Sequence, residues 1–322
     1  MRKIFLPVLT FVSLMLISLF CFSNAPAQEE GKKPEKDNNK GYAGVEICQT
    51  CHAKVYDALA KTTMGTMFLK HPRTADEKLG CETCHGAASE HVASGGKTFA
   101  GMVRFTKCGQ NSSHERSEAC LKCHQKRERL FWSGSAHEEQ NLACTDCHVV
   151  HTGPGVTARS QLKNLTVEDT CKTCHKEQVA AEWKFSHHPQ REGKMSCASC
   201  HNPHGTTSPK LIKAIGNKEL CFNCHAQYRG PFLFQHPPVL EDCFNCHQPH
   251  GSPYPALLKQ PVIRLCRECH VSFHDISFQA KSGPTSPLPG RIRTNQMMGA
   301  ACINCHRNIH GSNSFNGNLF FR

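Results

Sequence analysis

The sequence predicts a chain of short repeats that is mostly irregular, with short α-helices and almost no β-sheet. The motif Cys-x-x-Cys-His occurs ten times in 322 residues, and a new copy begins every 22 to 39 residues. A unit of that length is too small to bury a core by itself. Apolar residues make up only 39% of the chain and aromatic residues 7%, whereas Cys and His each number 22. Something other than side chains must therefore fill the interior.

The ten motifs have the form that attaches c-type haem. Two thiols on one turn can each form a thioether with a vinyl group of the same porphyrin, and the next residue then lies under the iron. The sequence thus predicts ten covalently bound haem c groups, each with its iron. The predicted attachment residues are Cys48, Cys51, Cys81, Cys84, Cys120, Cys123, Cys144, Cys147, Cys171, Cys174, Cys197, Cys200, Cys221, Cys224, Cys243, Cys246, Cys266, Cys269, Cys302 and Cys305.

The histidine that closes each motif is the predicted proximal ligand of the iron. A single Cys-x-x-Cys could equally be half of a zinc site or a redox dithiol. Ten copies with His in the same place argue against zinc, because zinc ribbons do not require that residue. The proximal set is His52, His85, His124, His148, His175, His201, His225, His247, His270 and His306.

Local patterns predict where the short helices and the loops lie. Helical patterns follow the first motif over Ala53–Lys61 and the fifth over Lys176–Lys184. Two long gaps between motifs, Val92–Glu118 and Asp275–Ala300, are rich in Gly, Ser or Pro and are predicted to be loops.

The N-terminus has the form of an export signal. Two basic residues precede an apolar run, Ile4–Phe22, and a small-x-small sequence ends at Ala27, which predicts a cleaved signal peptide over residues 1–27. The alternative is an uncleaved membrane anchor, since the run is nearly long enough to span a bilayer. Residues 28–45 are charged and poor in apolar side chains, which predicts a flexible leader.

The second axial ligand decides between an electron carrier and an enzyme. Twelve histidines remain beyond the ten motifs, so there are more than enough to close every iron from both sides. His151, His204 and His250 stand three residues after a proximal histidine, and His274 and His310 stand four after. A residue that close lies on the proximal side of its own haem, so it must bind a different iron. The alternative for each is a surface histidine that ligates nothing.

The net charge of +12, counted with neutral His, does not predict a nucleic-acid partner. The two propionates of each haem would offset most of that charge.

The motifs and their flanking residues resemble the MtrA/DmsE-type family of periplasmic decahaem cytochromes. The resemblance covers essentially the whole mature chain. It is most specific over Cys197–Gly205, Cys221–Pro231, Cys243–Gly251 and Cys302–Asn313, which contain His-Asn-Pro-His-Gly, Tyr-Arg-Gly-Pro, His-Gln-Pro-His-Gly and Ile-His-Gly-Ser-Asn.

The resemblance implies an elongated haem array in two five-haem halves, which we place at residues 46–190 and 191–322. It also implies a periplasmic location associated with the outer membrane, inside a β-barrel partner. In that family the chain carries electrons between a periplasmic or inner-membrane cytochrome donor and an extracellular multihaem cytochrome or terminal reductase.

The resemblance further implies the distal ligands, and it leaves one site in doubt. Where the family's first repeat usually has His-Gly, this chain has Met64-Gly65, so Met64 is the candidate sixth ligand of the first haem. The alternative is that Met64 or Met67 packs in the interior and His71 ligates. The nine implied histidines are His91, His137, His151, His188, His204, His236, His250, His274 and His310.

Four side chains keep open roles. His71 and His114 are surplus to the predicted ligand set, and His187 could exchange roles with its neighbour His188. Cys108 is unpaired in the mature chain and is predicted to be a buried, inert thiol.

Three functional classes follow. The first is an electron-transfer protein, not an enzyme, that conducts electrons between periplasm and exterior through an outer-membrane complex. The second is a soluble periplasmic electron shuttle. The third is a multihaem reductase, which would need an open iron; the surplus of histidines argues against it.

Overall fold

Short helices are set at or beside the Cys-x-x-Cys-His motifs. The computed structural model describes residues 41–107, 109–151, 161–270, 301–315 and 317–320, so the predicted signal peptide, most of the predicted leader, Cys108, His274 and the predicted loop Asp275–Ala300 lie outside it. The α-helices are α1 Val45–Ala60, α2 Thr63–Gly65, α3 Ala75–Lys78, α4 Glu82–His85, α5 Ser89–Ala93, α6 Ser113–Leu121, α7 Ala136–Glu139, α8 Cys144–Cys147, α9 Val167–Cys171, α10 Lys176–Ala181, α11 Cys197–Cys200, α12 Asn217–Phe222, α13 Pro237–Glu241 and α14 Val262–Arg267.

Single turns of tighter or wider helix complete the regular structure. One is a π-helix, η1 Thr66–Lys70, which continues directly from α2. The 3-10 turns are η2 Arg127–Arg129, η3 Pro209–Leu211, η4 Ala226–Tyr228, η5 Cys243–Asn245, η6 Pro255–Leu257, η7 Cys302–Asn304 and η8 Gly317–Leu319.

The first two predicted helices are present with different bounds. Helix α1 begins before the first motif and contains it, and its backbone leaves the helical region only at His52, with φ −111° and ψ 35°. The helix predicted over Ala53–Lys61 is thus the second half of a longer one. Helix α10 covers the first part of the range predicted after the fifth motif.

The loop predicted over Val92–Glu118 is partly wrong, because α6 begins at Ser113. The Ser112 hydroxyl accepts a hydrogen bond from the Glu115 backbone N–H at 3.1 Å, and the Glu115 carboxylate accepts one from the Ser112 N–H at 2.7 Å. This reciprocal pair is a capping box, which starts a helix by satisfying its free N–H groups. The sequence contains the Ser-x-x-Glu spacing of a capping box at Ser112 and Glu115, but the loop prediction followed from the Gly and Ser content of the segment.

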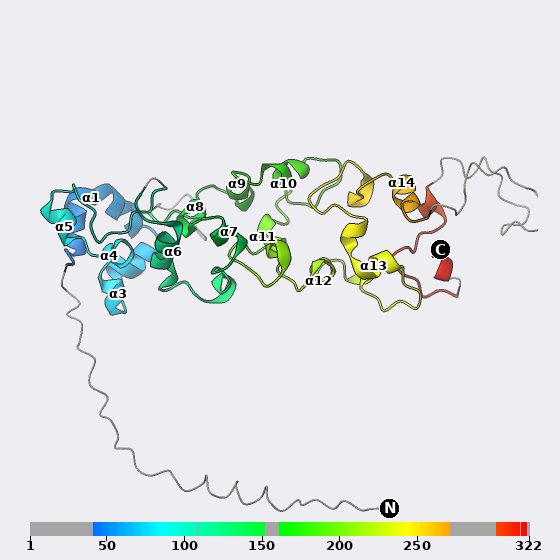
Figure 1. The fold of residues 1–322 in the computed structure, drawn as a ribbon, viewed down its shortest axis with the longest axis horizontal. Coiled ribbons are helices and arrows are strands. Elements are labelled where there is room, and N and C mark those ends of the chain that lie inside the picture. The colour runs from blue at the N-terminus through cyan, green and yellow to red at the C-terminus, as the bar shows by residue number, and fades with distance from the viewer. Residues whose placement is uncertain (1–40, 108, 152–160, 271–300, 316, 321–322) are drawn as a thin grey trace, which may run out of the picture. The chain divides into compact units, whose positions relative to one another are not determined.

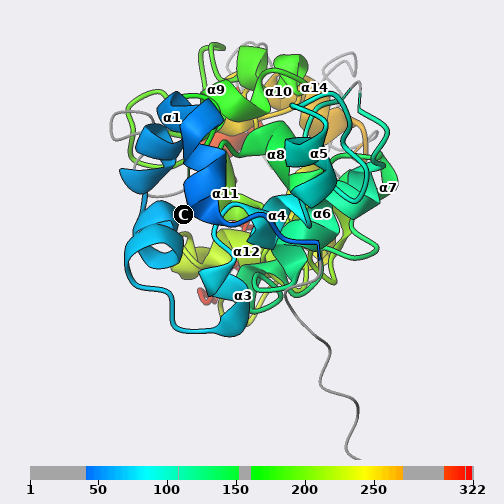
Figure 2. The same cartoon turned by 90° about the vertical axis from the view of Figure 1, so that its left-hand side faces the viewer.

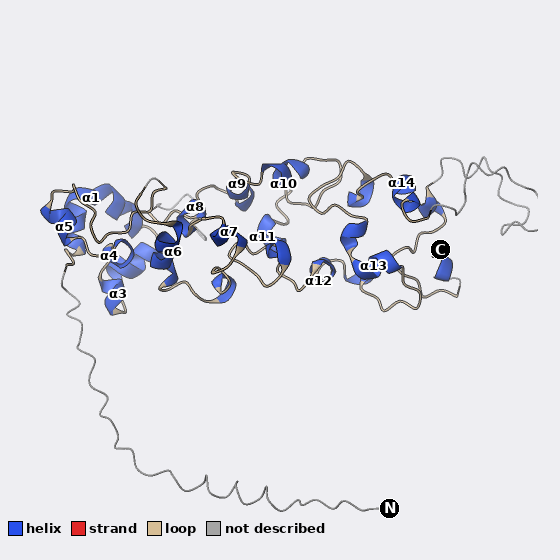
Figure 3. Cartoon of the chain, viewed as in Figure 1, coloured by secondary structure: helices blue, strands red, loops and turns tan. Residues whose placement is uncertain are grey.

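The described residues contain no β-strand, and Figure 3 shows helices and loops only. Five isolated bridges are present, and three of them follow one scheme: His148 pairs with Leu162, His201 with Ile212 and His247 with Leu258. In each, the chain leaves the motif histidine, turns, and returns beside it.

Within the unit Gly41–Arg322, elements contact those of the neighbouring repeats. Helix α4 contacts α6, α6 contacts α8, α9 contacts α11, α12 contacts η5 and α14 contacts η7. Figure 1 shows the elements from α1 to α14 following one another along this unit, and Figure 2, which looks from the α1 side, shows helices arranged around its periphery. The division into two five-haem halves stays a prediction.

The protein part of the molecule has a very small apolar core. Among the described residues, the buried hydrophobic side chains are Leu59, Phe68, Ala88, Ala119, Trp132, Ala143 and Ile212. In the polypeptide without haem, other large apolar side chains are exposed to solvent, including Trp183 at 68% and Phe185 at 77%. A porphyrin offers the apolar surface that such side chains would cover, so the residues fit a chain built around haem.

None of the helices in the described ranges is long and apolar enough to cross a membrane.

A buried carboxylate joins the start of α1 to the second motif. Glu82, which is 3% exposed, accepts hydrogen bonds from the backbone N–H groups of Ala43, Gly44 and Ala88, each at 2.9 Å. Hydrogen bonds to a charged acceptor are stronger than neutral ones. Glu82 therefore holds the first two motifs at a fixed distance.

Replacing this carboxylate should loosen the N-terminal end. We expect Glu82→Ala to lower the free energy of unfolding of this end by about 2 kcal/mol, because three N–H groups lose their acceptor. Amide hydrogen exchange at Ala43, Gly44 and Ala88 measures the effect. Glu82→Gln keeps one acceptor oxygen and should show a smaller change, whereas unchanged exchange in Glu82→Ala would contradict the role.

Candidate functional site

Eight motif histidines each face a second histidine ring at nearly the same distance. The separations between ring centroids run from 5.9 Å to 6.4 Å. Two metal–nitrogen bonds of about 2 Å, with the radius of each ring added, give roughly 6 Å between centroids. The pairs are His52 with His91, His85 with His151, His137 with His175, His148 with His204, His188 with His225, His201 with His250, His236 with His270 and His247 with His310.

Backbone carbonyls fix the orientation of many of these rings. A carbonyl oxygen only accepts, so an Nδ1 that bonds to one carries the proton and leaves Nε2 as the free lone pair. This is the tautomer that an iron needs. The Nδ1 bonds run from His85 to Val103 at 3.1 Å, His91 to Thr98 at 2.8 Å, His137 to Pro203 at 2.8 Å, His188 to Pro249 at 2.9 Å, His201 to Lys210 at 2.8 Å, His247 to Ala256 at 2.7 Å and His306 to Leu319 at 2.6 Å.

Burial keeps several of the facing rings neutral. It lowers the pKa of His204 to about 4, and it also lowers the pKa of His151, His250 and His310. A lowered pKa means that the imidazole stays uncharged at neutral pH. The neutral form is the one that ligates a metal.

Cysteines of consecutive motifs influence one another electrostatically along the described array. Burial and the Cys81 thiol raise the pKa of Cys48 to about 11. None of the described cysteines forms a disulfide. Five pairs are within hydrogen-bonding reach, namely Cys48 with Cys81, Cys120 with Cys144, Cys171 with Cys197, Cys221 with Cys243 and Cys266 with Cys302. Four more interact only through their charges, namely Cys84 with Cys123, Cys147 with Cys171, Cys200 with Cys224 and Cys246 with Cys269.

The structure places a histidine where Met64 is the predicted sixth ligand of the first haem. The proximal histidine of that motif, His52, faces His91 at 6.3 Å. An imidazole thus lies opposite the proximal histidine of the first motif, and Met64, which is half-buried in α2, is not needed at that place.

The geometry selects His188 over His187. The His187 Nδ1 bonds the Lys184 carbonyl at 3.0 Å and its Nε2 bonds the Glu192 carboxylate at 3.2 Å, so both nitrogens are engaged. The Glu192 carboxylate also raises the pKa of His187. His188 instead faces His225 at 6.4 Å.

Two other predicted residues have different surroundings. The His114 nitrogens lie 3.9 Å and 3.5 Å from the carboxylates of Glu118 and Glu138 at an exposed position, so His114 is a surface residue beside two carboxylates. His274, the predicted distal ligand that follows the ninth motif, lies outside the described residues.

The residues that orient the proximal rings were not predicted from the sequence. Lys210 and Ala256 supply their carbonyls from left-handed backbone, with φ of 57° and 53°. A repeated Pro-x-Leu-x-Lys sequence, Pro209–Lys213 and Pro255–Lys259, marks these segments and could have been found as a second, weaker repeat.

Comparison with known proteins agrees with this geometry. A family model described as doubled CXXCH motif matches residues 187–230 and 236–275, and one described as cytochrome c-type protein NrfB-like matches residues 81–163. The multihaem cytochrome MtrA of Shewanella baltica is 37% identical over 303 residues, which cover 92% of this chain and 87% of that protein. The chain belongs to the MtrA family of multihaem cytochromes. Its cofactor is therefore covalently bound haem c, and its activity is electron transfer.

Less similar relatives of this MtrA family member include another polyhaem cytochrome and a sulfite reductase. The C-type polyheme cytochrome OmcB of Geobacter sulfurreducens is 23% identical over 69% of this chain and 31% of its own length. The dissimilatory sulfite reductase MccA of Wolinella succinogenes is 23% identical over 50% of this chain and 28% of its own length.

Replacing His188 should change the spin state of one haem, whereas replacing its neighbour His187 should not. We expect His188→Ala to leave one haem per molecule five-coordinate, because His225 would then have no facing imidazole. His187→Ala should leave every haem low-spin, because its nitrogens bond protein atoms. Electron paramagnetic resonance of the oxidised proteins measures the high-spin signal, and a high-spin signal in His187→Ala alone would reverse the assignment.

Proposed function

We propose that this chain is a ten-haem cytochrome that conducts electrons between the periplasm and the cell exterior. The observation that carries the proposal is the succession of cysteine pairs, in which a cysteine of each motif interacts electrostatically with one of the next, from the first to the tenth. Attachment sites that follow one another in this way would place ten haems in one row. The facing histidine pairs are the proposed axial ligands along that row.

The chain's own residues would hold and insulate the row. Bound haem supplies a one-electron iron couple. The cysteines fix each group at a set distance from its neighbours, and Nδ1 bonds to carbonyls such as those of Lys210 and Ala256 keep the rings from rotating. Ligands on both faces leave no position for a substrate, which favours electron transfer over bond chemistry.

The proposed location and partners rest on the N-terminal sequence and on the family. An apolar run followed by a small-x-small sequence supports export to the periplasm. Membership of the MtrA family supports insertion into an outer-membrane β-barrel. The proposed electron partners are a periplasmic or inner-membrane cytochrome on one side and an extracellular multihaem cytochrome or terminal reductase on the other.

A lipid-vesicle assay tests the proposed conduit. The chain is purified with its native barrel partner, inserted into vesicles that hold a reduced dye, and exposed to an external electron acceptor that cannot cross lipid. We expect oxidation of the dye with the complex and no oxidation with the barrel alone. The mass of the purified chain should show ten haems.

The same preparation separates the conduit from the soluble shuttle. If the chain fractionates entirely with soluble periplasmic proteins, and adding it with the barrel moves no electrons across the vesicle, the conduit is wrong.

A further inference from the structure

Seven of the eight facing pairs obey a rule of sequence order. Histidines that follow the third, fifth and seventh motifs face the proximal histidine two motifs further on, as His137 faces His175 of the fifth motif. Histidines that follow the fourth, sixth, eighth and tenth motifs face the proximal histidine two motifs back, as His204 faces His148 of the fourth. Under this rule the segment after the first motif serves the third motif, whose proximal histidine is His124.

In the part of the chain that the structure describes, the third motif lacks a facing imidazole. Within the described residues, no histidine ring lies opposite His124 at the spacing that the other eight pairs share. His91, which comes from the second repeat, already faces His52. The first repeat therefore has a ligand to give, and the third site has a position to fill.

We call a histidine that faces a later motif a forward ligand and one that faces an earlier motif a backward ligand. In two places a forward ligand lies beside a backward one. The Nδ1 of His137 bonds the carbonyl of Pro203, the residue before the backward ligand His204. The Nδ1 of His188 likewise bonds the carbonyl of Pro249, the residue before His250. The same position in the fourth repeat is the carbonyl of Val150, directly before His151. A histidine from the first repeat would bond there.

In the fourth repeat a glutamine takes that carbonyl. The Gln161 side-chain amide donates to the Val150 carbonyl at 3.4 Å. The matching residues of the sixth and eighth repeats are Leu211 and Leu257, which have the same left-handed backbone and no side-chain donor. The match is fixed by backbone bonds: the carbonyls of Gln161, Leu211 and Leu257 each accept from the residue after the motif histidine, at 2.7 to 2.8 Å. The carbonyls of Pro203 and Pro249 thus accept from an imidazole, whereas the matching carbonyl of Val150 accepts from the Gln161 side chain.

The spacing and the local structure favour Met64 as the residue in that place. The forward ligands stand 13, 13 and 11 residues after their motif histidines, Met64 stands 12 after His52, and His71 stands 19 after it. Thr62 caps the turn by accepting from the Gly65 N–H at 2.9 Å. A Cβ at Gly65 would lie 1.8 Å from the Leu59 carbonyl oxygen, so this turn is pressed against the end of α1 and Met64 is fixed in place.

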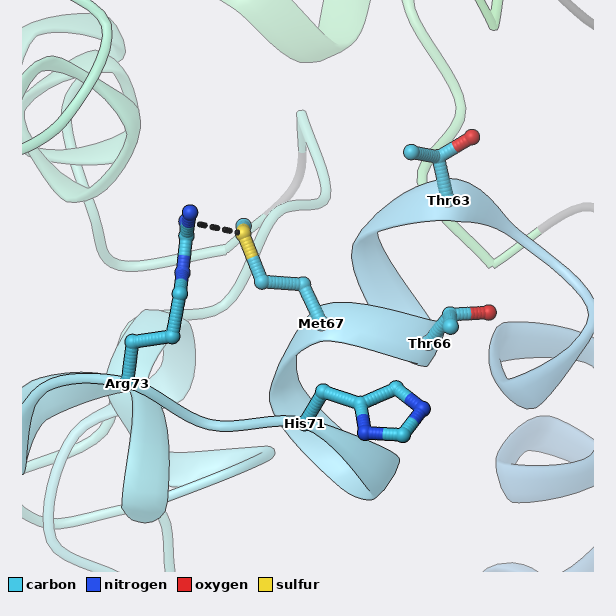
Figure 4. A pocket seen from close by; sticks show the side chains of 5 residues that line it. All are labelled: Thr63, Thr66, Met67, His71 and Arg73. Carbon is cyan, nitrogen blue, oxygen red and sulfur yellow. Dashed lines mark hydrogen bonds between the residues drawn. The ribbon is translucent and has the colours of Figure 1, made fainter.

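The two alternatives to Met64 as a ligand are Met67, whose sulfur already accepts a hydrogen bond, and His71, whose side chain lies at the surface. The sulfur of Met67 accepts a hydrogen bond from the Arg73 guanidinium at 2.9 Å. Figure 4 shows this contact, with the ring of His71 directed away from it beside Thr66. Met67 and His71 line the same surface pocket, and Met64 is not among the residues that line it.

We propose that Met64 is the sixth ligand of the third haem, opposite His124. Thioether ligation raises the reduction potential relative to two imidazoles. This site would then hold an electron more tightly than its neighbours, near the N-terminal end of the row. The proposal rests on the haem row proposed above, but spectroscopy of the isolated chain tests it without any partner.

The first test uses the sulfur-to-iron charge-transfer band of oxidised His/Met haem at the red edge of the spectrum. We expect the purified chain to show this band at the intensity of one haem per molecule. Met64→Ala should abolish it, whereas the controls His71→Ala and Met67→Leu should keep it. Met64→His should abolish the band, keep all haems low-spin and remove the highest-potential step of a redox titration. No band in the unmodified chain, or a band that survives Met64→Ala, overturns the proposal.

The second test identifies the haem that carries the band. Cys120→Ala with Cys123→Ala removes the third attachment site, and Cys48→Ala with Cys51→Ala removes the first. Mass spectrometry should show one haem lost from each. We expect the band to be absent from the former and present in the latter, and the reverse result would return Met64 to the first haem. Failure of the vesicle assay would leave both spectroscopic results unaffected.

Discussion

The array depends on facing histidine pairs whose two members belong to different repeats. A unit of 22 to 39 residues cannot bury a core, and the described hydrophobic core amounts to a few scattered side chains. Ligation of haem iron by the proposed pairs would solve this problem, because each of the eight facing pairs joins two separate repeats. The pair of His137 with His175 spans 38 residues, and that of His247 with His310 spans 63. The chain and its cofactor must therefore be built together.

Backbone contacts reinforce the same cross-links where the ligands meet. Ser186 and Ser252 exchange two backbone hydrogen bonds at 2.9 Å and 2.8 Å beside His188 and His250. Close approach is also required at Gly251, whose φ is 138° and where a Cβ would lie 1.9 Å from the Ala181 carbonyl oxygen. The glycine that follows the ligand histidine thus lets one repeat lie directly against another. This is the physical reason for the His-Gly sequence in these repeats.

The sequence predicted what depends on local chemistry and missed what depends on distant pairing. Cys-x-x-Cys-His is a local signal, and so is the argument that His204, three residues after His201, cannot reach its own iron. Which iron His204 would reach instead is set by 56 residues of intervening chain, and no pattern states that. The prediction that Met64 serves the first haem follows from the family resemblance, which likewise does not state which iron a side chain reaches in the folded chain. The choice between His187 and His188 needed the positions of Glu192 and Pro249, which also come from the folded chain.

The sequence order of the facing pairs affects the N-terminal end of the array. Repeats three, five and seven place a histidine at a later motif, and repeats four, six, eight and ten place one at an earlier motif, so this pattern supplies no histidine to the first motif. The second repeat meets this need by supplying His91 to His52, the immediately preceding motif. The third haem still depends on the first repeat, so a change of ligand there alters one site and leaves the cross-links of the other repeats intact. A residue with a different donor atom is therefore tolerated best at the N-terminal end, which is where this chain has Met64 in place of histidine.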